Sequence, residues 1–75
     1  MDIKAIIQLL QTKFPGGKIE AECEGSHLQL TIVSDIFSGL PPLKKQRLVY
    51  EALNDKIASG EIHAVNMKTL TPNQI

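Results

Sequence analysis

The chain has 75 residues, enough for a single domain (1–75), and its 43% content of apolar residues suffices for a compact core. Eight Lys and Arg balance eight Asp and Glu, which argues against a protein whose main work is bulk electrostatic binding to nucleic acid or to a membrane. A single cysteine, Cys23, has no partner for an intrachain disulfide and fits a reducing compartment. No apolar run reaches the roughly 20 residues of a membrane span, and the first residues lack a signal-peptide pattern. We therefore expect a cytoplasmic domain.

The first half of the chain predicts a helix followed by a hairpin. Residues 2–14 have the apolar spacing of an amphipathic helix, and Asp2 is expected to cap its first turn. Residues 15–17 should end this helix, because proline cannot continue it and glycine accepts the turn. Residues 18–23 and 27–33 alternate between apolar and polar, as half-solvated strands do. The short glycine-containing turn between them predicts an antiparallel hairpin.

The second half predicts a long helix and a last strand. The helix should begin at Pro42, where the missing N–H of proline costs little, and end at Ser59-Gly60. Its expected buried side consists of Leu43, Val49, Tyr50, Leu53 and Ile57. The apolar segment 36–40 before it is expected to pack back onto the core. The last strand should cover residues 62–70, with His63 at its start and a Thr-Pro turn at its end.

The element order is therefore helix, strand, strand, helix, strand. A helical crossover between the second and third strands should be right-handed and leave them parallel. If the strand order is 1-2-3, Cys23, His27 and His63 lie at one end of the sheet, since adjacent strands are about 4.8 Å apart. From the residues alone, His63 is either a metal ligand or a strand residue that simply hydrogen-bonds or faces water. Cys23 is equally interpretable as a small buried residue, and His27 as an exposed turn residue.

Five segments, spread over almost the whole chain, carry a recognisable pattern. They are Gly25-Ser26-His27-Leu28, Val33-Ser34-Asp35 with Phe37-Ser38-Gly39, Lys45-Gln46-Arg47-Leu48-Val49-Tyr50, Ile62-His63-Ala64 and Lys68-Thr69-Leu70-Thr71-Pro72. Together they resemble the BolA-like family, and within it the bacterial IbaG type. The chain departs from the pattern at Leu28, where relatives often have an aromatic residue. It also departs in its 72–75 tail, where many relatives carry an acidic pair and a tryptophan.

The resemblance implies a single α/β domain of αββαβ order, similar to the class II KH fold. The sheet would be three-stranded and mixed, of order 1-2-3, with the helices packed on one face. The implied partner is a monothiol glutaredoxin, with which family members share a bridging [2Fe-2S] cluster assisted by glutathione. Such a protein acts in iron–sulfur cluster assembly or trafficking and in iron or stress regulation. Some bacterial members are described as DNA-binding transcriptional regulators.

The resemblance also implies metal ligands. His63, in the Ile-His-Ala motif, matches the family's constant ligand. The second ligand comes from the loop between the first two strands, where the chain offers His27, favoured by its Gly-Ser-His context, and Cys23. Two histidines on one iron raise the reduction potential of a [2Fe-2S] cluster, and protonation of a ligating histidine would lower cluster retention in mild acid. Because one cysteine and two histidines fall short of four ligands, a partner protein or glutathione must supply the rest.

A basic cluster, Lys44, Lys45 and Arg47, lies at the start of the long helix. These side chains are able to contact DNA phosphates, to dock an acidic partner surface, or simply to form a solvated helix face. The neutral net charge weakens the DNA interpretation. No serine–histidine–carboxylate set and no paired acids in an active-site motif occur in the sequence, so we expect no enzymatic activity.

Overall fold

The structure is a computed structural model that describes residues 1–74. The elements in chain order are α1 (Ile3–Lys13), β1 (Lys18–Glu24), β2 (His27–Val33), the 3-10 helix η1 (Asp35–Phe37), α2 (Pro42–Ala58), β3 (Ala64–Leu70) and the 3-10 helix η2 (Pro72–Gln74). This is the expected αββαβ order with two short helical turns added. Ile75, the last residue of the tail that departs from the family pattern, lies outside the described residues.

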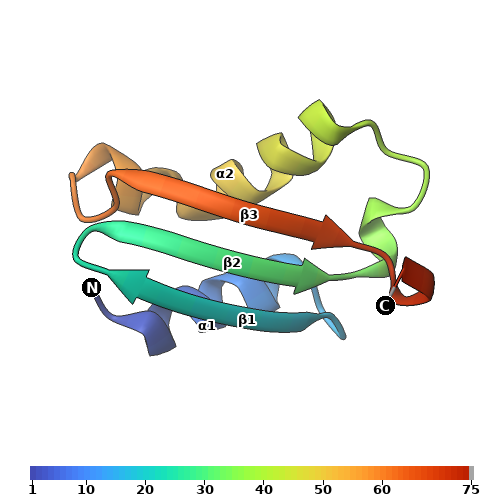
Figure 1. Ribbon diagram of the computed structural model, residues 1–75, viewed down its shortest axis with the longest axis horizontal. Helices are drawn as coiled ribbons and strands as arrows, with labels where there is room; N and C mark the ends of the chain where they lie inside the picture. The colour runs from blue at the N-terminus through green and yellow to red at the C-terminus, as the bar shows by residue number, and fades with distance from the viewer. Residues whose placement is uncertain (75) are drawn as a thin grey trace.

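The three strands form one mixed sheet of order β1-β2-β3, which confirms the expected order. β1 and β2 pair antiparallel, from Lys18 opposite Val33 to Glu24 opposite His27. β2 and β3 pair in parallel, as the helical crossover predicted, with His27 opposite Ala64. The β1–β2 turn and the α2–β3 connection consequently lie side by side at one end of the sheet, on the left in Figure 1.

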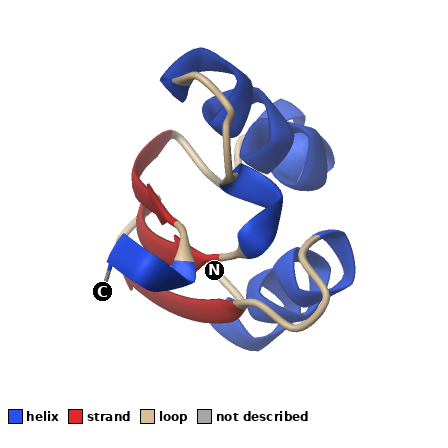
Figure 2. Cartoon of the chain, turned by 90° about the vertical axis from the view of Figure 1, so that its right-hand side faces the viewer, coloured by secondary structure: helices blue, strands red, loops and turns tan. Residues whose placement is uncertain are grey.

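Both helices cover the same face of the sheet, so the fold has two layers (Figure 2). The residues buried between these layers are Ile6, Leu10, Phe14, Leu28, Leu30, Ile32, Phe37, Val49, Leu53 and Ile62. Burial of apolar surface is worth about 25 cal/mol per Å², so this layer is the main source of stability. The other face of the sheet carries polar residues and is open to solvent, which confirms an α/β domain with helices on one face only.

Local interactions explain where α1 begins and ends. Asp2 caps the helix as expected, because its carboxylate accepts a hydrogen bond of 3.1 Å from the Ala5 backbone N–H. Gly16, with a φ of 78°, makes the turn that follows the helix. The ring of Phe14, buried just after the helix, lies 5.0 Å from that of Phe37. Within the segment 36–40, Phe37 therefore packs onto the core as expected, whereas Ile36 is 43% exposed.

Two residues that were expected on the buried side of α2 are exposed instead. Leu43 is 66% and Tyr50 is 41% exposed. The buried residues of α2 are Val49 and Leu53, and each step along a helix turns the side chain by about 100°. Leu43 and Tyr50, seven residues apart, therefore lie together on the flank of the helix beside its buried stripe. No helix within residues 1–74 has both the length and the apolar character needed to cross a membrane.

The last strand starts later than expected. β3 begins at Ala64, so Ile62 and His63 belong to the α2–β3 connection. The backbone N–H of Ile62 donates to the Lys56 carbonyl over 3.2 Å, a helix-end interaction that keeps this residue out of the sheet ladder. The Ile62 side chain is only 1% exposed. The residue before His63 is thus anchored in the core.

Candidate metal-ligand end of the sheet

The three predicted ligands lie at the same end of the sheet but do not form one cluster. Cys23 is the second-last residue of β1, His27 is the first residue of β2, and His63 directly precedes β3. Within residues 1–74, no three His, Cys, Asp or Glu side chains are grouped so that they could hold a metal ion. The expected convergence is therefore found for the backbone positions and not for the side chains.

Strand alternation explains why the side chains diverge. Cys23 has the same parity as Ala21 on β1, and its partner on β2 is the buried Leu28, so it lies on the helix-facing side. His27 has the opposite parity and lies across from Glu24 on the open face. Cys23 is nevertheless exposed, so the interpretation of this residue as a small buried one is wrong. The physical reason is that β1 is an edge strand, which has a neighbour on one side only.

His63 is held through both its backbone and its side chain. Its backbone N–H donates to the Ser26 carbonyl over 2.9 Å. The ring nitrogen Nδ1 is hydrogen-bonded to Ser26 Oγ over 3.0 Å. Ser26 and His63 directly precede His27 and Ala64, the first pair of residues in the parallel β2–β3 ladder. The pairing of the two segments therefore extends back to Ser26 and His63. With Nδ1 engaged, Nε2 is the ring nitrogen of His63 that is left for a ligand.

The α2–β3 connection before His63 is held by several polar contacts, and it places Gly60 beside the imidazole ring of His63. Gly60 has a φ of 83°, and a Cβ at this position would lie 3.7 Å from His63 Nε2. Lys56 Nζ and Glu61 Oε2 form an ion pair of 3.3 Å, and the Glu61 backbone N–H donates to Ser59 Oγ over 3.3 Å. These contacts fix the path of the chain between α2 and β3, and the absence of a side chain at Gly60 keeps the space beside Nε2 open.

Ser26 is the residue of this site that sequence reasoning missed. In the sequence, Ser26 is the middle residue of the Gly-Ser-His motif, and the motif alone assigns it no role. A hydroxyl residue in the turn just before a strand that pairs with β3 was the available signal. Using that signal requires the β2–β3 register, which is set by three-dimensional pairing rather than by the motif.

His27 and Cys23 have looser surroundings than His63. They share a hollow of about 160 Å³. Its lining residues are Glu22, Cys23, Glu24, His27, Gln29 and Asn66. Among the side-chain hydrogen bonds of residues 1–74, none involves His27 or Cys23. The side chains of these two strand residues are therefore not fixed by side-chain hydrogen bonds within residues 1–74.

The donor types of these residues are compatible with an iron–sulfur centre. Imidazole nitrogen and cysteine sulfur are both donors found at [2Fe-2S] clusters. A ligating histidine usually has its other ring nitrogen hydrogen-bonded, which is the arrangement of His63 with Ser26. Since the chain brings at most three such donors to this end, the remaining ligands must come from elsewhere.

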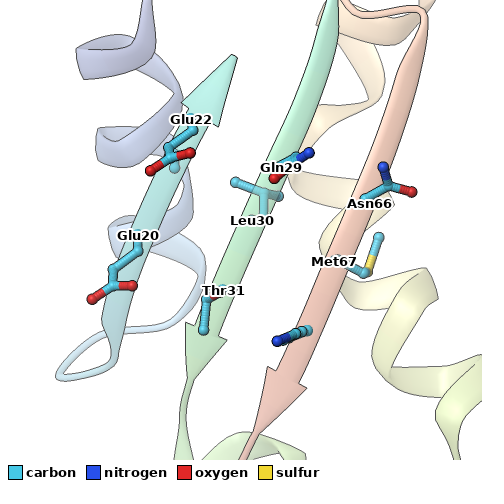
Figure 3. Close-up of a pocket in the computed structure, with 9 residues that line it drawn as sticks. Glu20, Glu22, Gln29, Leu30, Thr31, Asn66 and Met67 are labelled. Atoms are coloured by element: carbon cyan, nitrogen blue, oxygen red, sulfur yellow. The ribbon is translucent and has the colours of Figure 1, made fainter. Parts of the chain in front are cut away.

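A hollow lies over the middle of the open sheet face, and no histidine or cysteine of residues 1–74 lines it. It has a volume of about 400 Å³. Figure 3 shows Glu20 and Glu22 of β1, Gln29 and Thr31 of β2, and Asn66 of β3 along it. This polar surface lies away from His63 and carries no nucleophile or paired acid arrangement to which we assign a reaction.

The basic cluster lies at the opposite end of α2 from His63. Lys44 and Arg47 are exposed and Lys45 is half-buried. None of the three takes part in an ion pair with another of residues 1–74. α2 has 17 residues, which at 1.5 Å per residue separates its two ends by roughly 25 Å. The basic cluster and the candidate metal ligands are therefore two separate surfaces.

Comparison with known proteins adds the family. The family model described as BolA-like protein matches residues 11–74. The acid stress protein IbaG of Escherichia coli K12 is 35% identical over 72 residues, covering 96% of this chain and 86% of the relative. The BolA domain of SufE1 from Arabidopsis thaliana superposes with a TM-score of 0.88 at 30% identity, covering 96% and 93% of the two chains. A BolA homologue from Coxiella burnetii gives a TM-score of 0.82 at 32% identity, covering 99% and 95%. The chain belongs to the BolA-like family.

Proposed function

We propose that this protein is a non-catalytic iron–sulfur adaptor that pairs with a monothiol glutaredoxin and shares a bridging [2Fe-2S] cluster with it. The observation that carries the proposal is the state of His63. Its side chain is exposed, its Nδ1 is engaged by Ser26, and its Nε2 makes no hydrogen bond with residues 1–74. His63 also occupies the position of the family's constant ligand. When bound, the cluster supplies a redox-active, transferable iron centre, and the role of this chain is to hold and orient it.

We assign His27 as the second ligand in preference to Cys23. β2 pairs directly with β3, and His27 lies opposite Ala64, next to His63. Cys23 is on β1, one strand further away, which adds about 4.8 Å. Both His27 and His63 are exposed at this end of the sheet. Glutathione and the cysteine of the glutaredoxin would supply the remaining ligands.

The place of this adaptor in the cell follows from the same chemistry. A chain that offers two donors to a partner's cluster is suited to cluster assembly or trafficking, and through it to iron or stress regulation. The relative from Escherichia coli is named an acid stress protein. Histidine donors would make cluster retention sensitive to mild acid, since a protonated imidazole does not bind metal.

The test is a titration of a cluster-loaded monothiol glutaredoxin, with glutathione present, by the wild-type chain and three variants. The visible circular dichroism of the cluster should change with the wild type and with Cys23→Ser. It should change less with His27→Ala, and not at all with His63→Ala. If His63→Ala gives the wild-type spectrum and the wild-type complex stability, the ligand assignment is wrong. Far-ultraviolet circular dichroism of each variant controls for folding.

A second candidate function is DNA binding by the start of α2, as in a transcriptional regulator. Lys44 and Arg47 favour it, because their charges are exposed and lie outside the ion pairs of residues 1–74. Binding to duplex DNA should then weaken steeply with salt, and substitution of Lys44, Lys45 and Arg47 by Gln should reduce it uniformly across sequences. Absence of binding at low salt would remove this candidate.

A further inference from the structure

Ser26 forms two hydrogen bonds with His63, and these two bonds have different consequences. The bond from the His63 backbone N–H to the Ser26 carbonyl, 2.9 Å, fixes where the residue lies. The bond between Ser26 Oγ and His63 Nδ1, 3.0 Å, fixes how the ring is turned. A serine hydroxyl is able to donate or to accept, so this second bond is compatible with either neutral tautomer of the imidazole. Its direction decides which ring nitrogen keeps a lone pair.

We propose that Ser26 is a positioning residue for the metal ligand: its Oγ accepts a hydrogen bond from Nδ1–H of His63 and thereby leaves the Nε2 lone pair free for iron. The inference rests on the proposed function, because it takes Nε2 as the ligating atom. A neutral imidazole carries one proton, so an Nε2 lone pair requires the proton to sit on Nδ1. Ser26 Oγ lies 3.0 Å from Nδ1, the nitrogen that would carry that proton, and is placed to accept a hydrogen bond from it.

The surroundings of Ser26 suit this role better than a role in the turn alone. Its hydroxyl makes no other hydrogen bond with residues 1–74, so it does not stabilise the β1–β2 turn by capping a backbone group there. The turn is already formed by Gly25, which has a φ of 62°. Ser26 is half-buried, and the ladder contact with His63 holds its own backbone in place.

The opposite side of the ring is left open for the metal. Gly60 stands beside Nε2 and has no side chain, whereas a Cβ there would contact this nitrogen at 3.7 Å. A hydrogen-bond partner on one nitrogen and open space on the other is the arrangement that pre-orients a histidine for metal binding. Ser26 also directly precedes His27, so this one turn residue adjoins both proposed ligands.

The primary test reads the tautomer in the metal-free protein by nitrogen NMR of the two histidine rings in mildly alkaline buffer. In the wild type, His63 should be protonated on Nδ1. In Ser26→Ala that preference should be lost and Nε2–H should become a major form. Ser26→Thr, which keeps a hydroxyl, should restore the wild-type pattern. The His27 ring in the same spectra reports whether the turn has kept its structure.

Three results overturn the inference: a wild-type His63 protonated mainly on Nε2, a Ser26→Ala tautomer identical to the wild type, or a threonine variant that behaves like alanine. Because no cluster is present, these outcomes do not depend on the proposed function. In the glutaredoxin complex, Ser26→Ala should then weaken cluster binding by about 10- to 100-fold, the usual cost of losing such a partner. If the tautomer follows the prediction but no complex holds a cluster, the proposed function fails and Ser26 still sets the ring.

Discussion

The two sides of the candidate metal site differ in how firmly they are held. On the α2–β3 side, His63 follows the core residue Ile62 and is bound by Ser26 through both backbone and side chain. On the hairpin side, His27 and Cys23 are exposed and line a hollow without side-chain hydrogen bonds to residues 1–74. Under the proposed function, one donor would be pre-oriented, whereas the choice between the two donors on the other side would depend on the bound partner.

Under the proposed function, this difference would let one chain serve a shared cluster. A fixed histidine defines where the metal must sit and limits the entropy lost on binding. A looser second donor is able to adapt to the geometry that the partner and glutathione impose. The fixed side should therefore be sensitive to changes in its support, and the loose side should tolerate them.

The largest expected effect comes from removing the core anchor of the fixed side. Ile62→Ala should lower the free energy of unfolding by about 2–5 kcal/mol, because it leaves a cavity at a side chain that is 1% exposed. Chemical denaturation measures this. Leu43→Ala is the matched control, since Leu43 is 66% exposed and its truncation should change stability by less than about 0.5 kcal/mol. Equal losses for the two variants would contradict the anchoring of His63 through Ile62.

An intermediate effect is expected at Gly60, where a side chain meets the ring. Gly60→Ala and Gly39→Ala should both cost about 1–2 kcal/mol of stability, because both glycines have positive φ values, 83° and 76°. Only Gly60→Ala places a methyl group 3.7 Å from His63 Nε2, since the space at Gly39 is open.

The two glycine variants therefore separate strain from access to the metal. Gly60→Ala should reduce cluster binding in the glutaredoxin complex, while Gly39→Ala should leave it at the wild-type level after allowance for stability. Cluster content per complex, read from visible absorption, is the measurement. A loss shared by both variants would mean that backbone strain alone is responsible.

The smallest effect is expected on the loose side, at Cys23. Cys23→Ser should change the free energy of unfolding by less than about 0.5 kcal/mol, because the side chain is exposed and makes no hydrogen bond with residues 1–74. It should also leave the cluster spectrum unchanged if His27 is the second ligand. If Cys23→Ser instead changes the cluster spectrum strongly and His27→Ala leaves it unchanged, then Cys23, and not His27, is the second ligand.

The sequence predicted the fold well because its signals were local and mutually consistent. Alternation in 18–23 and 27–33, the cap at Asp2 and the glycine turns each determine a short stretch of chain. The parallel pairing of β2 with β3 followed from the helical crossover between them. These are features that do not require knowledge of the register.

The site was predicted less completely because it depends on register and on side-chain direction. Cys23, His27 and His63 were placed at the correct end of the sheet, but alternation sends Cys23 and His27 to opposite faces. Ser26 acquires its role only when the pairing of β2 with β3 puts it opposite His63. The exposure of Leu43 and Tyr50 similarly depends on how α2 is rotated against the sheet.

The central claim is that His63 offers Nε2 to iron in a cluster held jointly with a glutaredoxin. Pulsed electron paramagnetic resonance of the reduced complex tests it most directly, with nitrogen-15 histidine only in this chain and an unlabelled partner. The account predicts nitrogen-15 hyperfine couplings from ligating imidazoles, with the strongest lost in His63→Ala and retained in Cys23→Ser. A cluster that shows no coupling to labelled histidine, or one whose couplings survive His63→Ala unchanged, would contradict it.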